Sequence, residues 1–280
     1  MNESLTRNAQ RWPLGNFDFN RLAAFATLAA SAMAFVVPSS AAELPSYATP
    51  EIPSYTEKQV DQPTGCEPDT PAYHAIRGCS NLLGSPDTDP ATRVRIFTMR
   101  GYAWLKEEEP VAAISDFTRA IDLDAENVSA ITGRARAHEV LKQYDEAIKD
   151  WTRLIDLHPD DPSPYRERGY SYHLVANYDL AIADFTRVLE LDNGNVDSLI
   201  GRANAYDALD KIPLALADFD RAIMVDARYP AIFIARAEMW DRRKENQKAI
   251  DDYSHALRIN SINLKVRQAL QRLGVSHPYP

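Results

Sequence analysis

Arginine and aspartate recur in this chain as pairs with a fixed spacing of sixteen residues. The five pairs are Arg100 and Asp116, Arg134 and Asp150, Arg168 and Asp184, Arg202 and Asp218, and Arg236 and Asp252. A guanidinium group and a carboxylate can form two parallel hydrogen bonds, which fix geometry as well as adding energy. Because function rarely needs five identical copies of one site, we expect a ladder of structural ion pairs that sets helix register.

The other residues capable of chemistry are dispersed along the chain. The sequence contains six histidines, but no glycine-rich phosphate loop, no H-E-x-x-H motif and no G-x-S-x-G motif. His138 occupies a position that holds Trp104, Tyr172, Tyr206 and Trp240 in the other copies of the repeat described below, which favours a packed role. His173 is expected to contact a partner rather than a metal. We therefore predict no catalysis, no cofactor and no metal site.

The only two cysteines, Cys66 and Cys79, lie close together in the sequence. In an oxidising compartment such a pair forms a disulfide, and closing a loop of this size stabilises a protein by roughly 3 kcal/mol. The spacing is not that of a C-x-x-C redox motif, although a reactive thiol or two unpaired cysteines remain the alternatives. We predict a structural disulfide.

The elements that must position these residues repeat every 34 residues. Alanines with this spacing are Ala113, Ala147, Ala181, Ala215 and Ala249. Four residues after each alanine stands an aromatic residue, and twelve residues before it stands a glycine or alanine. Such a period indicates stacked helical units. In the second unit, helical spacing predicts helices over 128–142 and 146–157, with Tyr144 and Asp145 in the turn and Pro159 ending the second helix.

The segments flanking the repeats differ in composition. Residues 1–42 carry arginines followed by an apolar run and small residues, which predicts a signal peptide cleaved after Ala42. Residues 43–65 are rich in Pro, Ser, Thr and Tyr and are predicted to be a flexible linker. Residues 66–93 are predicted to form an amino-terminal half-repeat, residues 94–261 five full repeats, and residues 262–280 a capping helix and tail.

Charge and export limit the classes of partner. The chain has 280 residues and a formal net charge of −9, which argues against binding nucleic acid. Cleavage after Ala42 would place the repeats in the periplasm or outside the cell. The alternative is that the apolar run is not cleaved and anchors the amino terminus of the chain in a membrane.

The repeated order of a small residue, an aromatic residue three places on, an alanine and a second aromatic residue resembles the tetratricopeptide repeat family. The resemblance covers residues 94–261, although the final proline of the family pattern is present only as Pro159 and the turn between helices lacks glycine. It implies an all-α fold, a right-handed α-solenoid of five helix-turn-helix repeats. It also implies a concave groove, lined by the first helix of each repeat, that binds extended peptides or helices of partner proteins.

By this resemblance, the partner-binding residues are those on the first helices that differ between copies. They are Arg95, Tyr102, Lys106, Arg136, Arg166, Tyr170 and His173 in the first three repeats, and Asn204, Asp207, Glu238 and Asp241 in the last two. The groove is therefore expected to be basic and aromatic at one end and acidic at the other, with Tyr102 and Tyr170 as rigid anchors. Alternatively, these residues form ordinary solvated helix faces.

The sequence thus predicts a non-catalytic scaffold of the cell envelope that binds an unidentified protein or peptide in its groove. A membrane-anchored structural or assembly subunit is the alternative.

Overall fold

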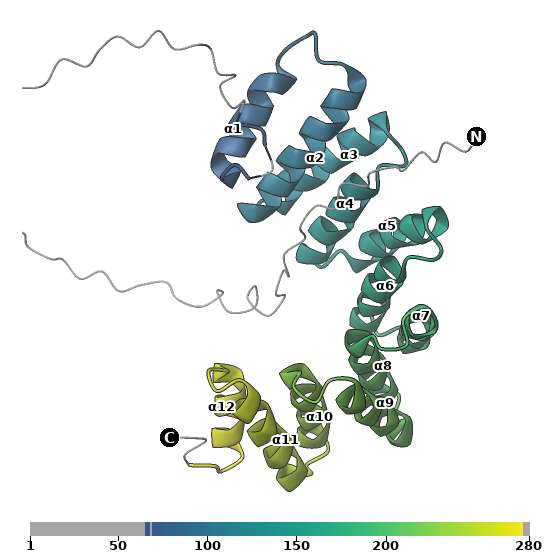
Figure 1. The fold of residues 1–280 in the computed structure, drawn as a ribbon, viewed down its shortest axis with the longest axis vertical. Helices are drawn as coiled ribbons and strands as arrows, with labels where there is room; N and C mark the ends of the chain where they lie inside the picture. Colours follow the sequence, from purple (N-terminus) through teal and green to yellow (C-terminus); the bar gives the residue numbers. More distant parts are fainter. Residues whose placement is uncertain (1–64, 68, 277–280) are drawn as a thin grey trace, which may run out of the picture. The chain divides into compact units, whose positions relative to one another are not determined.

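The computed structural model describes residues 65–67 and 69–276, which form twelve α-helices and no strand (Figure 1). The predicted signal peptide and almost all of the predicted linker lie outside the described residues. The helices are α1 (Ala72–Leu83), α2 (Pro90–Lys106), α3 (Pro110–Leu123), α4 (Val128–Val140), α5 (Tyr144–Leu157), α6 (Pro162–Leu174), α7 (Tyr178–Leu191), α8 (Val196–Ala208), α9 (Ile212–Val225), α10 (Pro230–Arg242), α11 (Asn246–Ile259) and α12 (Leu264–Arg272). None of the helices in this part of the chain is long and apolar enough to cross a membrane.

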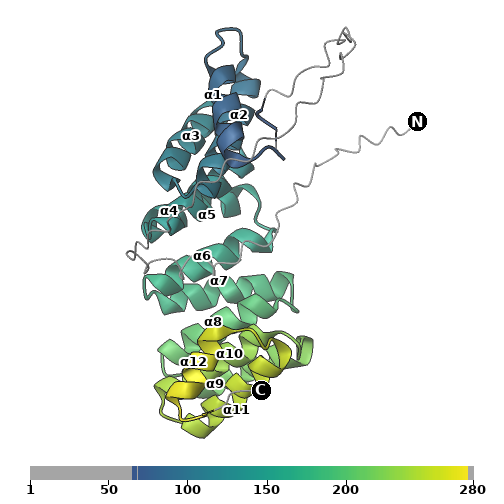
Figure 2. The same cartoon turned by 90° about the vertical axis from the view of Figure 1, so that its left-hand side faces the viewer.

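Successive helices pack in chain order, and the two views in Figures 1 and 2 show this succession from α1 to α12. The first helices of neighbouring repeats also touch, since α2 contacts α4, α6 contacts α8, and α8 contacts α10. Each repeat is therefore a helical hairpin that buries its apolar side against the next hairpin, which confirms the predicted α-solenoid.

The first helices begin with recognisable caps. The side chains of Asn127, Asp161 and Asn195 each accept a hydrogen bond from a backbone N–H in the first turn of the following helix. This satisfies a donor that the helix itself leaves free. Asp89 caps α2 in the same way, with Pro90 as the first helical residue. Because of this cap, α2 starts one turn early, and the predicted boundary at residue 93 falls inside it.

A residue with positive φ separates the two helices of every repeat. These residues are Glu108, Lys142, Ala176, Asp210 and Lys244, again 34 residues apart. The following N–H bonds back to a carbonyl oxygen five residues earlier, as Gln143 does to His138 at 2.9 Å. This bond closes the first helix and reverses the chain. The predicted turn at Tyr144 and Asp145 was therefore wrong, because both residues already belong to α5.

Aromatic residues of the second helices fill the space between hairpins. Phe117 is fully buried between Gly101 on α2 and Gly133 on α4. A Cβ atom on Gly133 would lie 2.3 Å from the ring, so this position needs a residue without a side chain. Phe185 occupies the same kind of space between Gly169 and Gly201.

The arginine–aspartate ladder is present in all five repeats, as predicted. In each pair, Nε and Nη2 of the arginine donate to the two carboxylate oxygens at 2.6–2.9 Å. Nη1 of the same arginine reaches the preceding hairpin, where it donates, for example, to Thr152 Oγ1 from Arg168 at 3.0 Å. Each arginine therefore joins the two helices of its own repeat and ties them to the repeat before.

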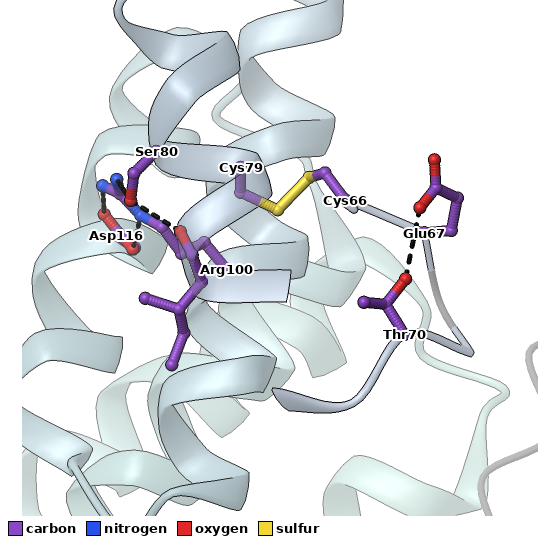
Figure 3. Close-up of a disulfide and its surroundings, with 8 residues drawn as sticks. Cys66, Glu67, Thr70, Cys79, Ser80, Arg100 and Asp116 are labelled. Atoms are coloured by element: carbon purple, nitrogen blue, oxygen red, sulfur yellow. Dashed lines mark hydrogen bonds and ion pairs between the residues drawn. A yellow bond between two sulfur atoms is a disulfide. The ribbon is translucent and has the colours of Figure 1, made fainter. Parts of the chain in front are cut away.

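The two ends of the helical stack are closed differently. At the amino-terminal end, Cys66 and Cys79 form the predicted disulfide, which fixes the segment before α1 to that helix (Figure 3). Beside it, Arg100 donates to both Ser80 on α1 and Asp116 on α3, so the ladder extends into the half-repeat. At the carboxy-terminal end, α12 buries Val266 and Leu270 and leaves Lys265 and Gln268 exposed. A polar outer face ends the stack because it offers little apolar surface on which another repeat could pack.

Candidate functional site

All eleven residues predicted to bind a partner lie on the first helices α2, α4, α6, α8 and α10, and we call them the first-helix set. The set is Arg95, Tyr102, Lys106, Arg136, Arg166, Tyr170, His173, Asn204, Asp207, Glu238 and Asp241. The structure distributes these residues along the stack rather than gathering them at one point. Their local contacts decide which of them are available to another molecule.

The cations near the amino-terminal end of the set are mostly free. Among the described residues, Arg95, Lys106 and Arg136 have neither a hydrogen bond nor an ion pair with another side chain. Arg95 and Lys106 are exposed, and Arg136 is half-buried on α4. Only Arg166 is engaged, through an ion pair of 2.8 Å with Glu167. This part of the surface can therefore offer guanidinium and ammonium donors to an anionic group.

The acidic residues at the other end are largely neutralised by the protein itself. Asp207 is buried and accepts hydrogen bonds from Arg242 at 2.6 Å and Arg243 at 2.8 Å. Asp241 pairs with Arg272 on α12. Glu238 is exposed and forms no ion pair within the described chain, while Asn204 is half-buried and has no recorded hydrogen bond there. Of the acidic residues that were expected to make this end of the groove acidic, only Glu238 is therefore unpaired within the described chain.

Tyr102 and Tyr170 are held inside the scaffold. The hydroxyl of Tyr102 donates to the backbone oxygen of Ser129 on α4 at 2.8 Å, and its ring meets Phe117 edge-on. Tyr170 repeats this arrangement two repeats later: its hydroxyl donates to the backbone oxygen of Asp197, and its ring meets Phe185 edge-on. Burial raises the pKa of both phenols. These contacts give each tyrosine an architectural role that the sequence did not predict.

Within the part of the chain that the structure describes, neither of the two candidate histidines lies in a cluster of side chains that could bind a metal ion or carry out catalysis. His173 is half-buried against the ring of Tyr178, and no hydrogen bond reaches its buried Nδ1 within the described chain. Burial and the nearby charge of Arg242 lower the pKa of His173. His138 lies at the end of α4, where Nδ1 hydrogen-bonds Gln143 at 2.8 Å. In the described residues, no group of three histidine, cysteine or acidic side chains is arranged to hold a metal ion.

Glu139, which is not in the predicted set, has a partly buried carboxyl group with two hydrogen-bond donors. Glu139 on α4 accepts hydrogen bonds from Trp151 Nε1 at 2.8 Å and from Ser171 Oγ at 2.9 Å. Burial raises the pKa of its carboxyl to about 7, although both hydrogen bonds act in the opposite direction. A signal for it exists in the sequence, because Trp151 replaces phenylalanine or tyrosine and a buried indole N–H needs an acceptor.

Comparison with known proteins identifies the repeats. Residues 98–162 and 132–196 match the family described as tetratricopeptide repeat. A thermophilic TPR protein from Thermus thermophilus shares the fold at 17% identity with a TM-score of 0.54, covering 66% of this chain and 98% of its own. No curated protein sequence gives a significant match.

Two further solved structures share the fold. YrrB, described as a TPR protein with an unusual peptide-binding site, has 15% identity and a TM-score of 0.51, covering 70% of this chain and 100% of its own. MamA from Desulfovibrio magneticus RS-1 has 13% identity and a TM-score of 0.54, covering 61% and 97%. Residues 98–196 therefore carry tetratricopeptide repeats, which generally mediate protein–protein interactions, and the solved structures show the same fold for the longer helical stack.

Proposed function

We propose that the chain is a non-catalytic scaffold, exported to the cell envelope, that binds an extended segment of a partner protein along its first helices. The observation that carries this proposal is the contrast between free cations and neutralised acids on one surface. Lys106 and Arg136 have no partner within the described chain, whereas Asp207 and Asp241 are paired with arginines. Charges that the protein does not neutralise with its own side chains are available for recognition.

The surroundings of Arg136 indicate the chemistry of the partner. Val140 follows it by one helical turn and is 43% exposed, and Leu174 on the next first helix is 58% exposed. A segment with a carboxylate beside an apolar side chain would match the guanidinium of Arg136 and these two residues. Arg136 would supply two parallel N–H donors, and the apolar pair would supply buried area.

Export is supported by the sequence before the repeats and by the disulfide. Cys66 and Cys79 form a disulfide. Disulfides persist in oxidising compartments and are rare in cytosolic proteins. Sequencing the amino terminus of the protein from fractionated cells tests this part of the proposal. A mature start at Glu43 in the soluble envelope fraction supports the exported scaffold, whereas an intact amino terminus in the membrane fraction favours the anchored subunit.

Binding is tested by comparing captured proteins between matched variants. Tagged wild-type protein, Arg136→Gln and Lys149→Gln are each recovered from the envelope fraction, and co-purifying proteins are quantified. Lys149 is an exposed cation on α5, paired with Glu146. We expect Arg136→Gln to lose a partner that Lys149→Gln retains. Equal recovery of every partner by both variants would refute the assignment to the first helices.

A further inference from the structure

The first repeat contains a cationic depression. It is open to solvent, has a volume of about 250 Å³, and is lined by Arg93, Phe97, Arg119, Asp122 and Leu123 from α2 and α3. None of these residues belongs to the first-helix set. A ligand of this depression would therefore bind outside the surface to which the proposed function is assigned.

Two guanidinium groups in this depression lie within cation–π range of one aromatic ring. The Cζ atoms of Arg93 and Arg119 lie 5.9 and 5.7 Å from the centroid of Phe97, which is buried. A third arginine, Arg100, also lies over the ring at 5.8 Å, but its donors are taken by Asp116 and Ser80. A cation–π contact uses the positive charge of a guanidinium without using its N–H groups as hydrogen-bond donors to an acceptor, so these groups can still bind an anion.

Arg119 is distinguished from its equivalents by having no acceptor. The arginines at the same repeat position are Arg153, Arg187 and Arg221. Arg153 donates to the backbone oxygen of Ala125, Arg221 donates to that of Asn193, and Arg187 donates to Glu190. Arg119 follows the half-repeat, where the loop has a different length, and it has no hydrogen bond or ion pair in the described chain. Its donors are left unused by the break in the period.

Arg93 owes its position to the early start of α2. At the same repeat position the later copies carry Asn127, Asp161, Asn195 and Tyr229, each of which is the residue directly before its helix. Because Asp89 caps α2 one turn earlier, Arg93 lies within the helix and is free to contact Phe97 instead. Both cations therefore result from departures of the first repeat from the pattern of the others.

We infer that this depression binds a single carboxylate of a partner chain, either an acidic side chain or a chain terminus, next to an apolar side chain. Arg93 and Arg119 supply two positive charges, while Asp122 supplies one negative charge in the same lining. The net charge of +1 matches a carboxylate better than a doubly charged phosphate, which Asp122 would repel. Leu123, which is 47% exposed, offers the apolar contact.

The binding is tested on the purified, disulfide-bonded protein by following the side-chain Nε–Hε signals of Arg93 and Arg119 by NMR during titration. The probes are acetyl-leucine, with a terminal carboxylate, and acetyl-Glu-Leu-amide, with a side-chain carboxylate. Acetyl-leucine amide lacks the charge and serves as the neutral control, and inorganic phosphate serves as the alternative anion. We expect saturable shifts with at least one carboxylate probe, and the tighter of the two identifies the source of the group.

Matched substitutions make the outcome specific. Arg119→Gln is expected to weaken carboxylate binding about tenfold, the effect of losing one charge-assisted contact, while Arg221→Gln at the equivalent position leaves it unchanged. Asp122→Asn is expected to improve phosphate binding more than carboxylate binding. The inference is overturned if neither carboxylate gives saturable shifts, if phosphate binds the wild-type protein more tightly, or if Arg119→Gln and Arg221→Gln behave alike.

Discussion

The hydroxyl of Tyr170 donates a hydrogen bond to the backbone oxygen of Asp197, which belongs to the first helix of the next repeat, 2.9 Å away. Tyr102 makes the same bond to Ser129 two repeats earlier. Each bond joins consecutive first helices at the surface where a partner is proposed to bind. The tyrosines therefore set the spacing of that surface.

Removing the hydroxyl of Tyr170 should cost stability. We expect Tyr170→Phe to lower the free energy of unfolding by about 1 kcal/mol, because the carbonyl loses its partner while the ring still packs on Phe185. Urea unfolding measures the change. Tyr172→Phe is the control, since the hydroxyl of Tyr172 has no recorded hydrogen bond in the described chain. An equal loss in both variants would show that the bond to Asp197 contributes nothing.

A rung of the ladder should be far more sensitive than a surface ion pair. Arg134→Met leaves the buried Asp150 without its partner, and we expect a loss of about 3–5 kcal/mol in unfolding free energy, measured by urea unfolding. Replacing both residues, as Arg134→Met with Asp150→Leu, should recover most of this loss because no charge is then stranded. Lys149→Met, which breaks the exposed pair with Glu146, should cost far less than Arg134→Met because water already screens that pair.

Two results would contradict the predicted order of stability among these variants. If Arg134→Met and Lys149→Met destabilise the protein equally, the ladder has no special structural role. If the double variant is less stable than Arg134→Met alone, the cost does not come from an unpaired aspartate.

The disulfide should stabilise one end of the stack. Substituting Cys66→Ala and Cys79→Ala together is expected to remove roughly 3 kcal/mol, concentrated in α1, because each hairpin contacts only its neighbours. Hydrogen exchange should therefore accelerate at α1 amides and stay unchanged at α7. Thiol titration of the unfolded, non-reduced protein should find no free thiol, and two free thiols would contradict the bond.

Glu139 should make stability depend on pH. Its pKa is raised from 4.5 to about 7 in the folded protein, chiefly by burial, so only the unfolded chain ionises between these values. The contribution of Glu139 to stability should therefore be largest below pH 4.5, fall by roughly 3 kcal/mol as pH rises to 7, and then remain constant. Glu139→Gln keeps an acceptor for Trp151 and Ser171 but cannot ionise.

We expect Glu139→Gln to lose this part of the pH dependence and to be more stable than wild type at pH 8. Urea unfolding at pH 5 and pH 8 measures both effects, with the exposed Glu126→Gln as control. The same fall between pH 5 and pH 8 in Glu139→Gln and wild type would exclude Glu139 as its source.

The parts of the fold that follow from local repetition were predictable from the sequence. The 34-residue period, the pairing of Arg100 with Asp116 and its four equivalents, and the disulfide are all present. The turn was misplaced because a residue such as Lys142 shows no sign in the sequence that its φ is positive. Helix faces could be assigned, but contacts between repeats could not.

The candidate surface was only partly predictable for that reason. Asp207 and Asp241 were expected to make one end of the groove acidic, yet arginines from the next repeat and the capping helix pair with them. Tyr102 and Tyr170 were expected to be anchors, yet carbonyl groups of the following first helix accept their hydroxyl hydrogens. Such contacts depend on the three-dimensional offset between hairpins, which a periodic sequence does not specify.

Site-specific crosslinking in the cell tests most directly whether a partner binds along the first helices. A photoreactive amino acid is placed at Val140 on α4 or at Leu180 on the second helix α7, two apolar positions with exposures of 43% and 44%. The proposal predicts a discrete covalent adduct with one envelope protein from position 140, lost in combination with Arg136→Gln, and none from position 180. The same adduct from both positions, or an adduct from position 180 alone, would contradict it.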